Sequence, residues 1–198
     1  MQQVIPEFDQ RRGTQHNFHT VQVLFRSFQR VELVANDWLP SWVRTFLFDA
    51  VCGNTDRHQN NWGLLADDVG TLRRFRLSPC YDNGTSLGHE LNETHHGGWN
   101  ETQFQAYIRR GRHHMKWAQG DPKGVQHLDL ITRLATLSKA SVHEAVEAHV
   151  WRMDLGELEE GLNRLCSLQI PIPLTSWRAG LILRLVKLRR AQLLEALK

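Results

Sequence analysis

Apolar residues recur with helical spacing through most of the chain, and this pattern predicts a mainly α-helical protein. The strongest stripe consists of neighbouring apolar pairs that repeat every four positions, at Trp42, Val43, Phe46, Leu47, Ala50 and Val51. A stripe two residues wide predicts a helix that is buried along one broad face. We expect Asn36 or Asp37 to cap the start of this helix and Gly53 to end it.

Weaker stripes predict further helices on both sides of this one. Before residue 36, helical spacing relates Val21, Leu24, Phe25 and Phe28. From residue 125 onward the chain is predicted to be helical, with a break at residues 170–174. A capping box is expected at Ser141, and Thr175 or Ser176 is expected to cap the last helix.

The last predicted helix combines an apolar side with a strongly basic side. Its apolar positions are Trp177, Leu181, Leu185, Leu188 and Leu193, and its basic positions are Arg178, Arg184, Lys187, Arg189 and Arg190. We expect the apolar side to pack on the rest of the chain and the basic side to face outward. Binding of the basic side to a membrane surface is the alternative interpretation.

A small β-hairpin is predicted after the first buried helix. Strand-like segments at residues 62–66 and 71–77 enclose a turn at residues 67–70. We therefore expect Asp67 and Asp68 to lie at the solvated tip of this hairpin. The helices and the hairpin together predict a mainly α fold that carries one small β element.

Residues 88–124 are rich in Gly, His and Asn and show little periodicity, so a mobile, solvated segment is expected there. Its histidines, at positions 89, 95, 96, 113 and 114, raise the possibility of zinc, but their spacing is poor for a structural site and no cysteine lies nearby. A basic, aromatic patch consists of Arg109, Arg110, Arg112, Lys116 and Trp117. This patch could face a peptide substrate, a phosphorylated segment or nucleic acid, and a solvated surface is the simpler expectation.

The composition fits one ordinary globular domain across residues 1–198. The chain is 41% hydrophobic and its net charge is only +3, so charge gives no reason to expect direct nucleic-acid binding. Its three cysteines form no CxxC motif and are typical of reduced thiols in a cytoplasmic protein. There is no run of about eighteen apolar residues, so no membrane span is predicted, and the first residues lack a signal-peptide core.

The candidate chemistry lies in the loop of residues 53–63 and in a second acidic turn after the hairpin. Asp56 and Asn61 are five positions apart in the loop, and Asp82 lies in the turn. Phosphoryl transfer needs a carboxylate that holds and deprotonates the attacking hydroxyl, and oxygen ligands that fix Mg²⁺ against the triphosphate. Carboxylate and amide oxygens are the ligands that Mg²⁺ prefers. The spacing therefore indicates a phosphoryl-transfer site.

The same stretch resembles a known family. A GN-x-D-x-H-x-x-N loop at residues 53–61 leads through the hairpin to a P-x-YD turn at residues 79–82. This arrangement resembles the C-terminal lobe of HipA-like serine/threonine kinases, most clearly over residues 38–90. Phosphatidylinositol kinases carry a similar D-R-H-x-x-N loop, but Phe48-Asp49-Ala50 before the loop and the run from Leu77 to Asp82 after the hairpin favour the HipA-like family.

The resemblance implies a protein-kinase-like C-lobe with ATP and Mg²⁺ as cofactors and a protein hydroxyl as substrate. Asp56 would be the catalytic base, and Asn61 and Asp82 would hold Mg²⁺ and thereby the nucleotide. Residues 1–12 resemble the hinge between the two kinase lobes, where the backbone at Glu7 and Phe8 would hold the adenine. Residues 38–90 would contain the catalytic loop, the hairpin and the metal-binding turn, and residues 125–198 the remaining helices.

No Gly-rich phosphate loop followed by a strand lysine is found, so the N-terminal lobe is expected to be absent. Three hypotheses follow. The chain could be one half of a split kinase, completed by a separate N-lobe protein, with an antitoxin as a further partner typical of the family. It could be a catalytically weak or inactive lobe that acts as a binding or regulatory module. It could also be a divergent lipid or small-molecule phosphotransferase.

The other polar residues near the loop have open or structural roles. His58 could shuttle a proton or could be a neutral, packed histidine. Arg57 could contact phosphate, or it could pair with a neighbouring carboxylate and shape the loop. Asn54 is expected to order the loop backbone, and His16 is expected to be structural.

Overall fold

The computed structural model describes residue 13, residues 15–69 and residues 72–198. The predicted hinge, with Glu7 and Phe8, lies outside these residues. The described residues are mainly helical and include one two-stranded antiparallel hairpin, which confirms the predicted mainly α fold with a small β element. Among the described residues, no helix has the length and apolar content that a membrane span requires.

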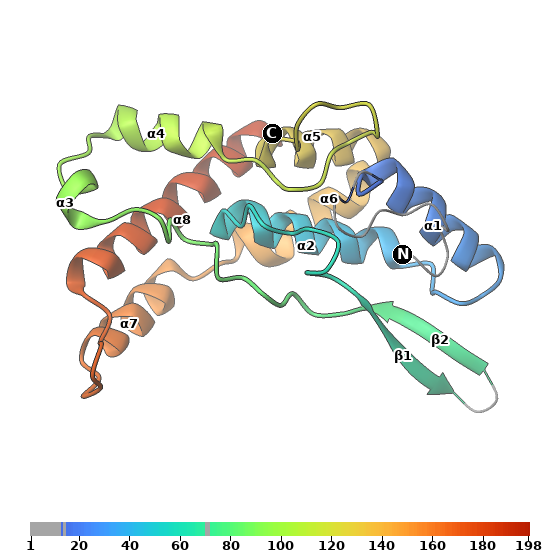
Figure 1. Ribbon diagram of the computed structural model, residues 1–198, viewed down its shortest axis with the longest axis horizontal. Helices are drawn as coiled ribbons and strands as arrows, with labels where there is room; N and C mark the ends of the chain where they lie inside the picture. Colours follow the sequence, from blue (N-terminus) through green and yellow to red (C-terminus); the bar gives the residue numbers. More distant parts are fainter. Residues whose placement is uncertain (1–12, 14, 70–71) are drawn as a thin grey trace.

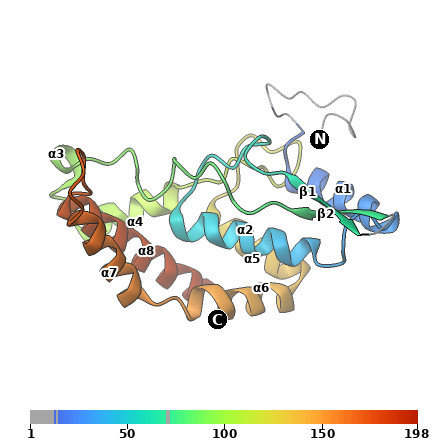
Figure 2. The same cartoon turned by 90° about the horizontal axis from the view of Figure 1, so that it is seen from below.

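The elements follow one another along the chain, with the hairpin between the second and third helices. The helices are α1 (Phe18–Arg30), α2 (Trp38–Cys52), α3 (Glu93–His96), α4 (Glu101–Arg110), α5 (His127–Leu137), α6 (Lys139–Val146), the π-helix η1 (Glu147–Trp151), α7 (Leu155–Cys166) and α8 (Ser176–Ala196), and the strands are β1 (Leu64–Val69) and β2 (Leu72–Leu77). Figures 1 and 2 show α1 and the hairpin at one end of α2, and α7 at the other end.

Helix α2 is the centre of the core and contacts α5, α6, α8 and β2. The six apolar residues of its predicted stripe are all buried, and Trp42 and Phe46 stack on each other with ring centroids 5.1 Å apart. Asp37 is its N-cap residue, although its side chain makes no capping hydrogen bond. Gly53 ends the helix in the left-handed region, with φ of 70°, as predicted.

The hairpin begins and turns later than predicted. Leu64 pairs with Leu77 and Val69 with Leu72, so Asp67 and Asp68 lie within β1 and the prediction that they form the tip is wrong. The Asp67 carboxylate accepts a hydrogen bond from Arg76 Nε at 2.8 Å across the two strands. The pairing of Val69 with Leu72 continues both strands past these aspartates and so places them outside the turn.

Trp62 is not part of β1 because its indole packs against the core. Its ring centroid lies 5.0 Å from that of Trp42, and its Nε1 donates to His16 Nε2 at 3.1 Å. The hairpin is attached to the chain that follows α1, where Phe75 N donates to Leu33 O at 2.7 Å. The predicted strand at residues 62–66 was therefore placed two residues too early.

The segment of residues 88–124 contains two helices that the sequence pattern did not predict. The longer one, α4, begins with a complete capping box in which Asn100 and Gln103 bond each other's backbone N–H groups. Only Phe104 of α4 is buried, and it packs in a small cluster with Leu181 and Leu185 of α8. Caps and contact with α8 therefore fix α4 without a broad apolar stripe, which is why periodicity missed it.

The predicted capping box at Ser141 is also wrong. Helix α6 begins at Lys139, so Ser141 lies inside its first turn and accepts a hydrogen bond from Ser138 at 2.7 Å. Ser138 is at once the C-cap residue of α5 and the N-cap residue of α6. The two helices therefore follow each other with one intervening residue, which leaves no room for a later start.

Helix α8 is capped by Thr175, whose side chain accepts a hydrogen bond from Arg178 N, as predicted. The prediction that all its basic residues face outward is wrong for three of them. Arg178 donates to Gly88 O at 2.7 Å and Arg190 donates to Val150 O at 2.8 Å.

Arg189 departs most from the predicted basic side, because only 6% of its surface is exposed. Its Nη1 donates to Cys52 O at 3.0 Å, at the C-terminal end of α2. Arg184 and Lys187 do lie at the surface, where they pair with glutamates. The arginines of α8 therefore bind carbonyl groups of distant segments as well as facing solvent.

Candidate active site

The loop after α2 is organised by a buried ion pair between Arg57 and Asp49. Neither side chain is exposed. Arg57 Nη2 donates to Asp49 Oδ1 at 2.7 Å and Arg57 Nε donates to Oδ2 at 3.1 Å, which is a bidentate arrangement. Asp49 also contacts His113 Nε2 at 3.0 Å and accepts from Asn54 Nδ2 at 3.1 Å. The carboxylate therefore has hydrogen-bonding partners on both oxygens.

Hydrogen bonding outweighs burial in this pair. Burial alone would raise the pKa of Asp49, but hydrogen bonds from His113 and Arg57 lower it. Burial alone would lower the pKa of Arg57, but its bonds to Asp49 raise it. Both groups are therefore held in their charged forms, and the alternative in which Arg57 pairs with a carboxylate and shapes the loop is the one that the structure supports.

Arg57 also joins the loop to the acidic turn. Its Nη1 donates to Asn61 O at 2.8 Å and to Tyr81 O at 2.7 Å, while Nη2 donates to Asn83 Oδ1 at 2.7 Å. Tyr81 adds a hydrogen bond from its hydroxyl to Asn60 O at 2.9 Å. One guanidinium thus bonds the backbone carbonyl of Asn61 and, on either side of Asp82, the carbonyl of Tyr81 and the side chain of Asn83.

Asp56 lies in the loop with its backbone held and its carboxyl partly open. Its N–H donates to Asn54 Oδ1 at 3.0 Å, which confirms that Asn54 orders the loop, and 40% of the Asp56 side chain is exposed. His58 Nε2 lies 3.9 Å from Asp56 Oδ1. A carboxylate in this position can be reached by a hydroxyl group from solvent.

Asn61 is buried and its amide orientation is fixed. Its Nδ2 donates to Asp56 O at 2.7 Å, so Oδ1 points away from Asp56 O. Asp82 is exposed and has a φ of 52°, in the left-handed region that a non-glycine residue rarely adopts. Such a conformation persists only where neighbours impose it, and the Arg57 bonds to residues 81 and 83 do so.

The side-chain oxygens of Asn61 and Asp82 are ligands of the kind that Mg²⁺ binds in proteins. Mg²⁺ is usually held by one or two carboxylates, with phosphate and water completing its coordination. Asn61 Oδ1 and the exposed Asp82 carboxylate supply oxygen atoms of that type. In the described part of the chain, no three or more His, Cys, Asp or Glu side chains lie close enough together to hold a metal ion. The histidines considered for zinc therefore form no such group.

A histidine cluster lies beside Asp56. The His58 ring is 5.7 Å from that of His114, which is 5.9 Å from that of His16. His58 Nδ1 accepts from Asn60 N at 3.1 Å, so this histidine is packed and hydrogen-bonded. Burial, with His113 as a further cause, lowers the pKa of His16 to about 3, which fits the structural role expected for it.

Two residues of this site were not assigned from the sequence. Asp49 occupies a buried face of α2, and His113 lies in the segment where no regular structure was predicted. A carboxylate inside an apolar stripe was the available signal for Asp49, because such a group needs a cationic partner. No comparable signal marked His113, since 64 residues separate it from Asp49.

Comparison with known proteins identifies a family and a similar fold. The model of the HipA-like C-terminal domain family matches residues 4–153. The crystal structure of the Helicobacter pylori proinflammatory kinase CtkA matches with a TM-score of 0.60 and 18% sequence identity, over 80% of this chain and 52% of that one. The chain thus spans about half the length of that kinase. No curated protein sequence matches the chain.

The structural likeness is at the level of the fold, and it confirms the predicted kinase-like C-lobe. The family model covers the catalytic-type loop, the hairpin and the acidic turn in one continuous match. The chain therefore belongs to the family of HipA-like C-terminal domains.

Proposed function

We propose that the chain is the C-terminal lobe of a HipA-like protein serine/threonine kinase that transfers phosphate from ATP to a protein hydroxyl. The observation that carries this proposal is the Arg57 guanidinium, which bonds the loop at Asn61 and the turn at Tyr81 and Asn83. A buried cation with these partners keeps together two segments that a phosphoryl-transfer site must combine.

Each candidate residue has a distinct role in this proposal. Asp56 accepts the proton of the substrate hydroxyl, for which its partly exposed carboxyl is suited. Asn61 Oδ1 and the Asp82 carboxylate hold Mg²⁺, which when bound neutralises charge on the phosphates of ATP. Arg57 and Asp49 are positioning residues. They hold the loop in place, and both side chains are fully buried, so neither contacts the substrate.

A second lobe is needed to cover the triphosphate, because the chain corresponds to about half of the kinase that it matches in structure. We propose that this lobe comes from the same gene or from a separate protein, and that an antitoxin is a further partner. The residues of the predicted hinge, Glu7 and Phe8, would hold the adenine between the lobes. The free cysteines of the described residues are in keeping with a cytoplasmic kinase.

Nucleotide binding by the chain tests the metal ligands. Titration with ATP, with and without Mg²⁺, is expected to show magnesium-dependent binding that Asp82→Ala and Asn61→Ala each weaken about tenfold or more, as the loss of a charged or metal-directed contact does. Asp67→Ala is the matched control, because Asp67 is a carboxylate on the nearby hairpin that pairs with Arg76. The assignment is contradicted if Asp67→Ala weakens ATP binding as much as the other two variants do, or if ATP binding does not depend on Mg²⁺.

Phosphate transfer tests the base. With the complementary lobe present, the chain is expected to phosphorylate a protein hydroxyl, and Asp56→Asn is expected to lower the rate by about 10² to 10⁴ while ATP still binds. If this variant transfers phosphate at the unaltered rate, Asp56 is not the base. If the complete protein binds ATP but transfers no phosphate, the chain is a regulatory nucleotide-binding module.

A further inference from the structure

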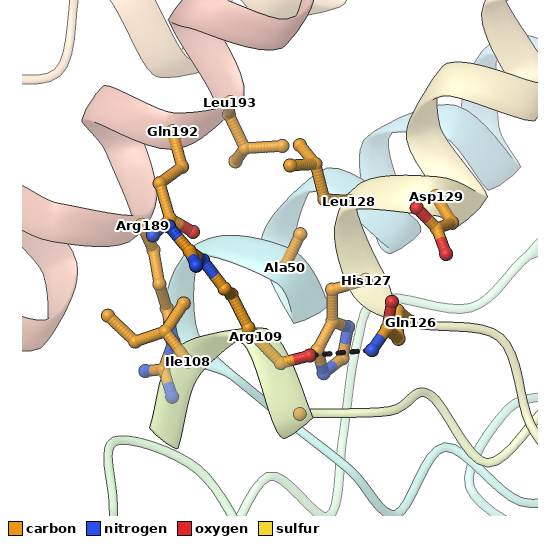
Figure 3. A pocket seen from close by; sticks show the side chains of 11 residues that line it. Ala50, Ile108, Arg109, Gln126, His127, Leu128, Asp129, Arg189, Gln192 and Leu193 are labelled. Atoms are coloured by element: carbon orange, nitrogen blue, oxygen red, sulfur yellow. Dashed lines mark hydrogen bonds between the residues drawn. The ribbon is translucent and has the colours of Figure 1, made fainter. Parts of the chain in front are cut away.

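A cavity of about 220 Å³ lies between α2, α4, α5 and α8, on the side of α2 away from the hairpin. Figure 3 shows side chains from these four helices around it. Its apolar wall includes Ile108, Leu128 and Leu193. Its polar lining includes His127 and two arginines, Arg109 and Arg189. None of these residues belongs to the candidate active site.

His127 is the polar group in this cavity that lacks a partner. It is 91% buried, and neither ring nitrogen has a hydrogen-bond partner among the described residues. Its contact with His113 is between perpendicular rings, with centroids 5.9 Å apart, and leaves both nitrogens unsatisfied. Burial lowers the pKa of His127 to about 3, so its neutral ring offers one donor and one acceptor. Buried polar groups in folded proteins are normally satisfied, which points to a missing partner.

The two arginines give the cavity a cationic side. Arg189 is buried, donates to Cys52 O and lies over the ring of Tyr107, which bonds Glu90, whereas Arg109 pairs with no carboxylate within the described ranges. Figure 3 shows the Arg109 side chain reaching back across the cavity from the end of α4. Asp129 also lines the cavity, but it lies beyond His127, on the side away from both arginines. A guanidinium without a carboxylate partner suits an anionic ligand.

We propose that this cavity binds a small organic carboxylate with an apolar body. The carboxylate accepts hydrogen bonds from Arg109 and Arg189, and the apolar body packs against the wall formed by Ile108, Leu128 and Leu193. The ring N–H of His127 donates to the same carboxylate and so gains the hydrogen bond that it lacks. Inorganic phosphate could bind the arginines but would leave the apolar wall exposed to water. The wall therefore favours a carboxylate that is attached to an apolar group. This site is independent of the proposed kinase activity.

Benzoate is a suitable probe, because it combines a carboxylate with an apolar ring. Its neutral analogue benzamide and inorganic phosphate separate the contributions of charge and apolar surface. Binding is measured by calorimetry and by NMR of the His127 ring and of the Leu128 and Leu193 methyl groups. We expect benzoate to shift these resonances, and to bind at least about tenfold more tightly than benzamide or phosphate, as a charge-assisted hydrogen bond allows.

Two neighbouring arginines provide a matched pair of variants. Arg109→Gln is expected to weaken benzoate binding about tenfold. Arg110→Gln is expected to leave it unchanged, because Arg110 is exposed, does not line the cavity and bonds only Ala106 O of its own helix among its described contacts. Both positions lie at the exposed end of α4, so neither substitution threatens the fold.

His127→Phe removes the ring nitrogens and is expected to weaken benzoate binding as well. Should that variant fail to fold, the comparison of Arg109→Gln with Arg110→Gln decides the question. The proposal is overturned if saturating benzoate leaves the cavity resonances unshifted, if phosphate or benzamide binds as tightly, or if the two arginine variants weaken binding equally.

Discussion

At the scale of single residues, Arg57 uses its whole hydrogen-bonding capacity. A guanidinium has five N–H donors, and each finds an acceptor: two on Asp49, and one each on Asn61, Tyr81 and Asn83. A lysine ammonium has three donors and lacks the planar geometry, so it cannot replace this set. The geometry of the loop and the turn therefore depends on one side chain.

Arg57→Ala is expected to lower the free energy of unfolding by about 3–5 kcal/mol, because it leaves the Asp49 carboxylate buried without its main cationic partner. Arg57→Lys is expected to recover only part of that loss. Arg76→Ala is the control, since Arg76 forms an exposed ion pair with Asp67 that is worth about 0–1 kcal/mol. Urea denaturation measures all three, and equal effects at positions 57 and 76 would contradict the role given to Arg57.

Sequence reasoning could name Arg57 as a loop residue but could not choose its role. Its acceptors at Tyr81 and Asn83 are 24 and 26 positions away, and two of its five bonds go to backbone carbonyls, which every residue has. The same holds for Arg189, which was expected at the surface and is buried against Cys52 O. Residue type set what these arginines can do, and tertiary packing decided where they do it.

At the scale of elements, the end of α2 determines the direction of the candidate loop. Gly53 has a positive φ there, and a Cβ at this position would overlap with the Arg189 guanidinium. Glycine is therefore required both for the backbone conformation and for the close approach of α8. Gly53 is therefore needed both for the turn that begins the loop and for the packing of α8 against the end of α2.

Gly53→Ala is expected to lower the free energy of unfolding by more than about 1 kcal/mol, because the left-handed conformation is costly for alanine and Arg189 must move. Gly180→Ala provides the opposite control. Gly180 lies within α8 with open space around it, so alanine there is expected to raise stability by about 0.5–1 kcal/mol. Thermal unfolding of both variants compares the two positions, and a neutral Gly53→Ala would show that this end of α2 is not restricted.

Elements with many apolar residues were predicted well, and those held by other forces were not. The apolar stripe of α2 predicted its extent, since hydrophobic burial is what stabilises that helix. Helix α4 has one buried residue and depends on its capping box and on α8, so its pattern carried little signal. The strands of the hairpin were offset because Trp62 is placed by the core and not by strand pairing.

At the scale of the whole molecule, α8 connects segments that are far apart in the sequence. Its arginines bond carbonyl groups at Cys52, at Gly88 and Leu91, and at Val150 and Trp151. Leu185 and Leu193 of the same helix are buried in two different clusters of the core. The helix thus holds the ends of α2 and η1 and the chain before α3.

This helix lies entirely beyond residue 153, where the family match ends. A shortened chain of residues 1–153 would expose the apolar residues that α8 covers and leave those carbonyl groups without their arginines. We expect it to lose cooperative thermal unfolding, as followed by circular dichroism, while the chain of residues 1–198 retains it. A sharp, reversible transition in the shortened chain would show that α8 is dispensable.

The position of α8 bears on how related sequences should be divided. The family match covers the loop and the acidic turn, whereas the helix that holds the end of α2 lies outside it. A domain boundary drawn at residue 153 would therefore separate the candidate site from the helix that supports it, even with Asp56, Asn61 and Asp82 all in place.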